Sequence, residues 1–280
     1  MKPNGMIGLI TDFGTENRFT GIMKGVACSI DPGLKIFDIS HRVNTYNILE
    51  ASYLLADTIV YWPAGTVFCT VVDPGVGSER KSISVITNND QFIICPDNGV
   101  LTIVKKEIGL KEIRQIDEKT NRFPASHESA TFDGRDIFIY NAARLAAGKT
   151  DLTGLGFLRK DIISINVPLP ILSGNGISGI ITYVEKPFGN LCTNITSDLV
   201  SKKRWKCGQN FTVTISLAGK QLFREEIKFV KTFSEAGTGE PLLYIDSCGR
   251  LGLARNMVPM DQGIIPGRKT DGIKVEISAN

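Results

Sequence analysis

Two aspartates in the first half of the chain stand where a carboxylate can do chemistry. Asp12 directly follows the apolar run 7–11, and Asp73 follows the apolar, β-branched run 66–72. Both runs are typical of buried strands, and the carboxyl ends of parallel strands form the edge at which open α/β sheets bind ligands. A carboxylate there can hold ribose hydroxyls or a cation, or it can only cap the following turn through backbone N–H groups. The residues alone leave both interpretations open.

Arg80 follows Asp73 by seven residues, across a glycine-rich turn. Gly75 and Gly77 permit a tight return of the chain, which would bring the Arg80 guanidinium near the Asp73 carboxylate. The stretch lacks the Gly-Lys-Ser/Thr ending of a phosphate-binding loop. A structural salt bridge is the alternative to a functional role for this pair.

Two further segments place polar side chains in loop-like surroundings. Asp133-Gly134 suits a turn, and Asp136 suits the first turn of the helix predicted to follow. The segments 188–190 and 193–194 contain Asn190 and Asn194, whose amides are able to read the edge of an adenine. A hairpin turn is the alternative for that region.

The predicted secondary structure around these residues changes near residue 165. In the first half, predicted strands alternate with predicted helices, which favours an α/β domain with a largely parallel sheet. Prolines and glycines then indicate a linker, and beyond it helical periodicity gives way to hairpin-like strand pairs. These indicate a small all-β domain, a barrel or a sandwich. We therefore expect an α/β domain over 1–165, a linker over 166–178 and an all-β domain over 179–280.

Individual elements follow from the spacing of apolar residues. The predicted helices are 19–30, 48–62 and 135–147, with one more after Gly99. The predicted strands are 7–11, 35–39, 66–72, 211–217, 222–227, 242–245 and 273–277, with two shorter ones around 88–90.

Composition excludes several classes of partner. A net charge of +3 over 280 residues is too small to imply a nucleic-acid partner, and we interpret the basic cluster 202–206 as a solvated loop. No apolar stretch reaches the ~20 residues of a membrane span. Two histidines, His41 and His127, are too few for a histidine-based metal site, and the six cysteines lack metal or disulfide spacing. The chain opens without a signal-peptide pattern, so we expect a reduced, cytoplasmic protein.

Seven short motifs cover nearly the whole chain. Each is weak alone, but seven in order with matching gaps are specific. They are Thr11-Asp12-Phe13-Gly14, Asp38-Ile39-Ser40-His41, Asp73-Pro74-Gly75-Val76-Gly77, Pro96-Asp97-Asn98-Gly99, Thr131-Phe132-x-Gly134-Arg135-Asp136, Phe188-Gly189-Asn190 and Ala254-Arg255-Asn256. Together they resemble the S-adenosylmethionine (SAM) hydrolases, or SAM hydroxide adenosyltransferases, relatives of the SAM-dependent fluorinase and chlorinase.

The resemblance implies an N-terminal α/β domain, a C-terminal β-barrel and a homotrimer with SAM bound between subunits. It implies attack at the ribose C5′ with methionine leaving, and neither metal nor redox cofactor. Asp12 would bind the ribose hydroxyls with Tyr46 nearby, and Asn190 would read adenine. The remaining substrate-binding residues that the resemblance implies are Phe188, Phe233, Arg255 and Met257 around adenine, and Asn17, Glu185 and Ser247 near the methionine.

Asp73 and Asp133 bear on the choice of reaction. The halogenases carry tyrosine at position 73, whereas the hydrolases carry aspartate with a downstream arginine, here Arg80. A carboxylate repels a halide but orients a water, and the arginine stabilises developing hydroxide. The hydrolases complete a triad with histidine at position 133, where this chain has Asp133, which we expect to pair with Arg80 beside Asp73. The hypotheses are therefore a SAM hydrolase, a SAM- or adenosine-binding protein with impaired catalysis, and a halogenase.

Overall fold

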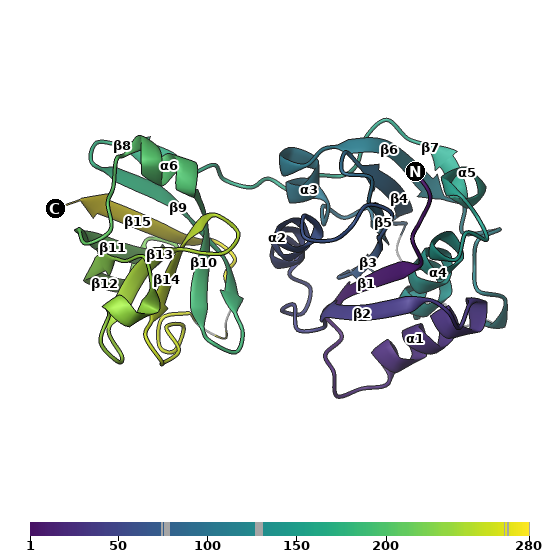
Figure 1. The fold of residues 1–280 in the computed structure, drawn as a ribbon, viewed down its shortest axis with the longest axis horizontal. Helices are drawn as coiled ribbons and strands as arrows, with labels where there is room; N and C mark the ends of the chain where they lie inside the picture. Colours follow the sequence, from purple (N-terminus) through teal and green to yellow (C-terminus); the bar gives the residue numbers. More distant parts are fainter. Residues whose placement is uncertain (74, 76–78, 127–130, 266, 268, 280) are drawn as a thin grey trace. The chain divides into compact units, whose positions relative to one another are not determined.

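The structure is a computed structural model of the 280-residue chain. It describes residues 1–73, 75, 79–126, 131–265, 267 and 269–279. The chain forms two compact units, Met1–Ile165 and Asn166–Asn280, each with its own hydrophobic core (Figure 1). Within the segment predicted as a linker, residues 171–173 and 176–178 already belong to strands of the second unit.

The described residues of the first unit contain one seven-stranded sheet, in the order β2-β1-β3-β5-β4-β6-β7. The first four strands run parallel, β4 and β7 run antiparallel, and β6 runs with the first four. This confirms the predicted α/β class with a largely parallel sheet. The strands are β1 (Met6–Thr11), β2 (Lys35–Ser40), β3 (Val67–Val71), β4 (Ser82–Thr87), β5 (Phe92–Pro96), β6 (Leu110–Ile116) and β7 (Gly156–Leu158).

Helices cover this sheet, and α1 and α4 pack together over one core (Figure 1). Helices α2 and α3 pack on each other, and Ser52 Oγ accepts the Ile103 N–H at 3.0 Å. None of the helices in the described ranges is long and apolar enough to cross a bilayer. The helices of this unit are α1 (Phe19–Ile30), α2 (Ile48–Ile59), α3 (Thr102–Glu107), η1 (Pro124–Ser126), η2 (Gly134–Ile139, a π-helical stretch), α4 (Tyr140–Ala146) and α5 (Leu152–Leu155).

In the second unit, seven described strands close into a barrel, which decides between the barrel and the sandwich. The order is β10-β14-β13-β12-β11-β15-β9, and β9 pairs with β10 to complete the ring, while β8 lies outside on β9. Along β11, alternate residues Phe211, Val213 and Ile215 are buried, as the two-residue period of a strand requires. The strands are β8 (Ile171–Ser173), β9 (Gly176–Glu185), β10 (Asn190–Thr196), β11 (Asn210–Leu217), β12 (Lys220–Phe229), β13 (Pro241–Ile245), β14 (Arg250–Arg255) and β15 (Ile273–Ala279).

Two details of the second unit differ from the sequence prediction. Thr193 and Asn194 lie in β10 and not in a loop, beside a bulge in its pairing with β9. Their polar side chains supply bonds there, since Asn194 Oδ1 accepts the Ile180 N–H at 2.9 Å. The helix α6 (Ser197–Lys202) and the 3₁₀ turn η3 (Phe233–Glu235) are too short to produce a visible helical period.

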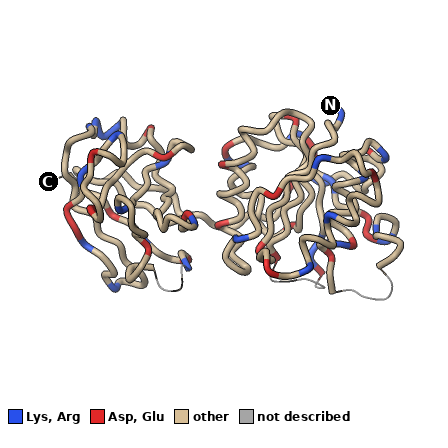
Figure 2. Tube along the Cα trace, turned by 60° about the horizontal axis from the view of Figure 1, so that its bottom comes forward, with Lys and Arg blue, Asp and Glu red and all other residues tan. Residues whose placement is uncertain are grey.

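Charged residues of both signs are scattered along the traces of both units (Figure 2). This distribution agrees with the small net charge of the whole chain.

The barrel core gives a stability prediction. Leu253 is fully buried in that core, so Leu253→Ala should cost the second unit about 2–5 kcal/mol of unfolding free energy. The chain has two tryptophans, Trp62 in the first unit and Trp205 against the barrel core. Urea titration followed by Trp205 fluorescence, in a Trp62→Phe background, measures the loss. The matched control Leu169→Ala, at a residue 65% exposed, should leave the midpoint unchanged; equal midpoints for all three proteins would contradict the assigned core.

Candidate functional site

The carboxyl ends of three neighbouring strands bring polar side chains to one edge of the first sheet. In the parallel pair β1–β3, Thr11 stands opposite Val71, so Asp12 and Asp73 leave the sheet at the same edge. Strand β5 ends there too, and Asn98 Nδ2 donates to the Val72 carbonyl at 2.8 Å. The arrangement that the sequence predicted for the two aspartates is therefore present.

Asp12 is partly buried and holds a neighbouring loop. Its Oδ2 accepts the Tyr46 N–H at 2.8 Å, and Tyr46 has a left-handed backbone with φ 66° and a side chain that is mostly exposed. Burial raises the pKa of Asp12, although the backbone hydrogen bonds act to lower it. Asn17 lies close by, where its Oδ1 accepts the Phe19 N–H at the start of α1 and its amide donates to the Phe13 carbonyl.

Asp73 and Arg80 form an ion pair, as their spacing predicted. Asp73 Oδ1 also accepts the Gly75 N–H at 2.8 Å, and only 7% of the Asp73 side chain is exposed. A Cβ at Gly75 would lie 2.7 Å from Arg80 Nη2, so the guanidinium packs directly against the backbone of the turn. Asp73 therefore both caps the turn and forms a salt bridge, so both interpretations describe it. Its carboxylate lies at the sheet edge with its charge balanced by Arg80. Residues 74 and 76–78 of this turn lie outside the described residues.

Asp133 differs from expectation in its partner. Among the described residues the cation beside it is Arg122, with Nη2 3.4 Å from Asp133 Oδ1, and not Arg80. Arg122 also lies 3.7 Å from the fully buried Asp136, which Arg135 holds at 2.6 Å. Burial raises the pKa of Asp133, and the charge of Arg122 acts to lower it. His127 lies outside the described residues.

The segment that carries Asp133 packs against the segment that carries Asp12. The rings of Phe13, Phe19 and Phe132 lie 5.0–5.8 Å apart. A Cβ at Gly134 would lie 3.3 Å from the Phe13 ring, so the glycine allows the close approach. Asp133 therefore stands between two residues that pack against the Asp12 turn.

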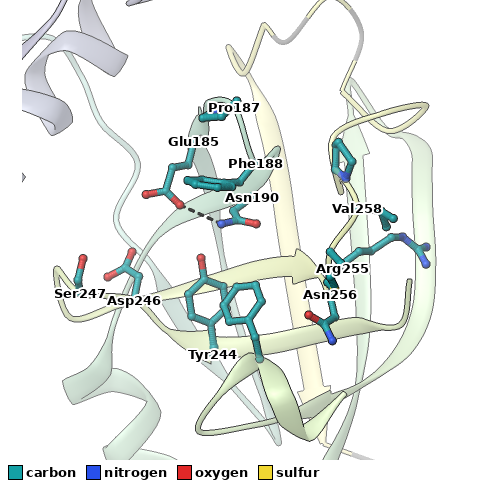
Figure 3. Close-up of a pocket in the computed structure, with 13 residues that line it drawn as sticks. Glu185, Pro187, Phe188, Asn190, Tyr244, Asp246, Ser247, Arg255, Asn256 and Val258 are labelled. Atoms are coloured by element: carbon teal, nitrogen blue, oxygen red, sulfur yellow. Dashed lines mark hydrogen bonds between the residues drawn. The ribbon is translucent and has the colours of Figure 1, made fainter. Parts of the chain in front are cut away.

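The second unit contains a cavity of about 610 Å³ beside strands β13 and β14 and the β9–β10 hairpin (Figure 3). This volume is within the range of small-molecule sites, about 300–1,000 Å³. The seven second-unit residues to which the resemblance gave a binding role all line it, together with six others, and Asn194 does not line it. The predicted ones are Glu185, Phe188, Asn190, Phe233, Ser247, Arg255 and Met257, and the additional ones are Pro187, Tyr244, Asp246, Asn256, Val258 and Pro259.

Polar groups inside this cavity are held in fixed orientations. Asn190 Nδ2 donates to Glu185 Oε2 at 2.9 Å, which leaves Asn190 Oδ1 turned the other way (Figure 3). Both residues stand at the β9–β10 hairpin, where they pair directly, so the hairpin interpretation of 188–190 and the binding interpretation are compatible. The Asp246 carboxylate accepts the N–H groups of Cys248 and Arg250 at 2.8 Å, and burial raises its pKa.

The floor and lip of the cavity are apolar. Burial raises the pKa of Tyr244, and its ring meets Phe233 edge-on at 4.9 Å between centroids. Phe188 and Met257 on the lip are 64% and 82% exposed. The Arg255 guanidinium is directed to Glu225 at 2.9 Å and points away from Asn190 (Figure 3). Flat aromatic faces beside an oriented amide suit a planar heterocycle such as a purine.

Comparison with known proteins assigns the chain to a family. Residues 7–156 match the model of the SAM hydroxide adenosyltransferase N-terminal domain, and residues 179–262 match the model of the C-terminal domain of that family. The chain belongs to the SAM hydroxide adenosyltransferase family. The resemblance found in its motifs is thereby confirmed.

Relatives of this chain carry two different names. A fluorinase from Actinoplanes sp. is 31% identical, over 92% of this chain and 93% of its own. An (R)-S-adenosyl-L-methionine hydrolase from Methanocaldococcus jannaschii is 33% identical, over 82% of this chain and 81% of its own. The crystal structure of an uncharacterized conserved protein from Thermotoga maritima matches with a TM-score of 0.86 and 35% identity, over 97% of this chain and 100% of that one. Family membership therefore leaves the reaction to be argued from the site.

Metal-ligating side chains are dispersed over the described part of the chain. Across these ranges, His, Cys, Asp and Glu side chains do not gather in threes that could hold an ion.

The Arg122–Asp133 contact gives a pH prediction. Because the pKa of Asp133 is raised in the folded state, folding takes up a proton, and stability falls as pH rises from the unfolded pKa to the folded one. Arg122→Gln removes the group that lowers this pKa, so the fall should extend to higher pH. Urea midpoints between pH 4 and 8 measure it.

The control for this prediction is the double variant Arg122→Gln/Asp133→Asn. It should lose the added pH dependence, because the asparagine side chain does not titrate, although Glu118 and Asp136 still face position 122. If the added pH dependence of stability persists in the double variant, it comes from Glu118 or Asp136 and not from Asp133.

Proposed function

We propose that this protein hydrolyses SAM to adenosine and methionine. The observation that carries the proposal is the Asp73–Arg80 ion pair at the sheet edge shared with Asp12. Membership of the SAM hydroxide adenosyltransferase family and a relative named (R)-S-adenosyl-L-methionine hydrolase support it.

In the proposed reaction a water oxygen bonds to the ribose C5′ as the C5′–S bond breaks. Methionine leaves with the bonding electron pair as a neutral thioether, and the attacking water releases one proton to the surrounding solvent water. The sulfonium is already a good leaving group, so the protein needs only to orient and partly desolvate the water. Asp73 accepts a hydrogen bond from that water, and the Arg80 charge stabilises its developing hydroxide character. SAM is the substrate, and the reaction as proposed requires neither metal nor cofactor.

Substrate binding is divided between the two units in this proposal. Asp12, with Tyr46 and Asn17 nearby, receives the ribose, and the barrel cavity receives the adenine beside Asn190 and Phe188. The remaining lining residues Phe233, Arg255 and Met257 complete the adenine contacts, while Glu185 and Ser247 face the methionine. A homotrimer with sites between subunits, implied by the resemblance, belongs to the same proposal.

One observation favours a second function, the binding of SAM or adenosine without efficient turnover. Asp133 replaces the histidine that the resemblance leads us to expect, and it is engaged with Arg122. Calorimetric binding of SAM with no product formed would favour this function. The fluorinase relative raises a third possibility, and the negative charge of Asp73 opposes a halide nucleophile.

The test is incubation of purified protein with SAM and chromatography for adenosine and methionine against a blank without enzyme. Enzyme-dependent adenosine is the expected result. Bound but intact SAM would establish the binding protein, and 5′-halo-5′-deoxyadenosine formed only with added halide would establish the halogenase.

Asp73→Asn should lower kcat about 100-fold or more while adenosine affinity stays within a few-fold, because the lost charge orients the water and not the nucleoside. The matched control is Asp90→Asn. Asp90 pairs with Lys111 at 2.6 Å before β5, at the opposite edge of the sheet, and its φ of 63° suits asparagine. Turnover that is unchanged in Asp73→Asn would remove Asp73 from the mechanism.

Asp133→His should raise kcat about tenfold or more, because an imidazole can take the water's proton near neutral pH. Steady-state product formation by Asp133→His and Asp133→Asn separates the gain in basicity from the loss of negative charge beside Arg122. An increase in both variants would point to charge alone, and an increase in neither would leave position 133 without a role in the rate.

A further inference from the structure

His41 is a buried histidine that the proposed reaction does not use. It follows β2, and 4% of the residue is exposed. Its Nδ1 lies 2.8 Å from Thr11 Oγ1, and its Nε2 lies 3.0 Å from Asp38 Oδ1. Asp38 in turn pairs with Lys24 of α1 at 2.6 Å. A continuous polar chain therefore runs from α1 to the last residue of β1, directly before Asp12.

The partners of His41 are all satisfied by one neutral tautomer. Thr11 Oγ1 accepts the Phe13 N–H at 3.2 Å, so the single hydroxyl proton is available for His41 Nδ1. The ring proton is then on Nε2 and is donated to Asp38. Burial raises the pKa of Asp38, but hydrogen bonds from Lys24 and His41 outweigh it and hold that pKa below its ordinary value. Asp38 is thus an ionised acceptor for the imidazole.

His41 also joins the two loops that make the Asp12 site. The Gly14 N–H donates to the His41 carbonyl at 2.8 Å, in addition to the contact between the imidazole and Thr11. A third contact, from the Tyr46 N–H to Asp12 Oδ2, closes the arrangement. The segments 11–14 and 41–46 are therefore held together at three points, two of which belong to His41.

We propose that His41 is a positioning residue, which acts through the Thr11 hydroxyl to hold the Asp12 carboxylate in place for the two ribose hydroxyls. The inference rests on the proposed function, in which Asp12 binds the ribose. Its effect is confined to ligands that carry those hydroxyls, since the hydrogen bonds of the imidazole go to Thr11 and Asp38 beside the Asp12 turn.

Two substitutions at position 41 remove the two hydrogen bonds of the imidazole one at a time. In His41→Asn the amide oxygen takes the place of Nδ1 and still accepts from Thr11, but the Asp38 bond is lost. In His41→Gln the amide nitrogen takes the place of Nε2 and still donates to Asp38, but the Thr11 bond is lost. Each variant removes one hydrogen bond of the imidazole. Because His41→Asn removes one more side-chain heavy atom than His41→Gln, a loss confined to His41→Gln does not come from lost volume.

The experiment is calorimetric titration of full-length wild type and both variants with adenosine and with 2′,3′-dideoxyadenosine. His41→Gln should weaken adenosine binding about tenfold, the effect of one buried hydrogen bond, while dideoxyadenosine binding changes less than about twofold. His41→Asn should stay within about threefold of wild type for both ligands. In an Asp12→Asn background, His41→Gln should cause no further loss. The ¹⁵N spectrum of wild type should show His41 as the Nε2–H tautomer, assigned by its disappearance in His41→Asn.

Several results would overturn the inference. Equal losses for both ligands, or equal losses in His41→Asn and His41→Gln, would make His41 a general structural residue. If His41→Gln does not fold, Thr11→Val removes the Thr11 hydroxyl, the other partner of the same hydrogen bond, and should reproduce the selective loss. If the wild type binds adenosine no better than dideoxyadenosine, the ribose contact of the proposed function is contradicted, and the role of His41 with it. If the wild type prefers adenosine and the variants bind as the wild type does, the role of His41 alone is contradicted.

Discussion

The parallel pairing of β1 with β3 is the constraint on which the rest of the first unit depends. It sets Thr11 opposite Val71, so the chain leaves both strands at one edge and places Asp12 and Asp73 there. A carboxylate at such an edge is costly unless its charge is balanced, and each of the two is supported differently: Asp73 by the Arg80 guanidinium, and Asp12 by a backbone N–H from the loop that carries Tyr46. Because each carboxylate has its own partner, the two can serve different parts of one ligand.

The second unit contributes flat apolar surface and one amide in a fixed orientation. Its strands close through the β9–β10 pair, and the hairpin of that pair carries Asn190. The Glu185 carboxylate fixes which end of the Asn190 amide faces the cavity, and Tyr244 and Phe233 supply an aromatic floor. Arg255 is drawn away by Glu225, so the cavity gains no strong positive charge from it. These features suit an uncharged nucleoside base.

Asp133 has a different charged partner from the one that the sequence predicted. Expected from the sequence to sit with Arg80, it lies with Arg122 in a group that also includes Asp136 and Arg135. This pairing follows from the contact between the segments 122–126 and 131–136, where the Phe123 N–H donates to the Asp136 carbonyl and brings Arg122 alongside. A guanidinium partner 11 residues earlier in the chain has no signature in the order of motifs.

By itself, the sequence determined the alternation of strands and helices in the first unit, the strand runs of the second, the family and seven of the residues that line one cavity. These follow from local periods and from motifs, both of which are carried by neighbouring residues. Only the tertiary structure decided that the second unit closes as a barrel, that Tyr244 and Asp246 join its cavity, that Thr193 and Asn194 lie in a strand, and that His41 links α1 to the Asp12 turn. Each of these depends on contacts between residues distant in sequence, where side-chain packing and hydrogen-bond geometry, and not local propensity, fix the outcome.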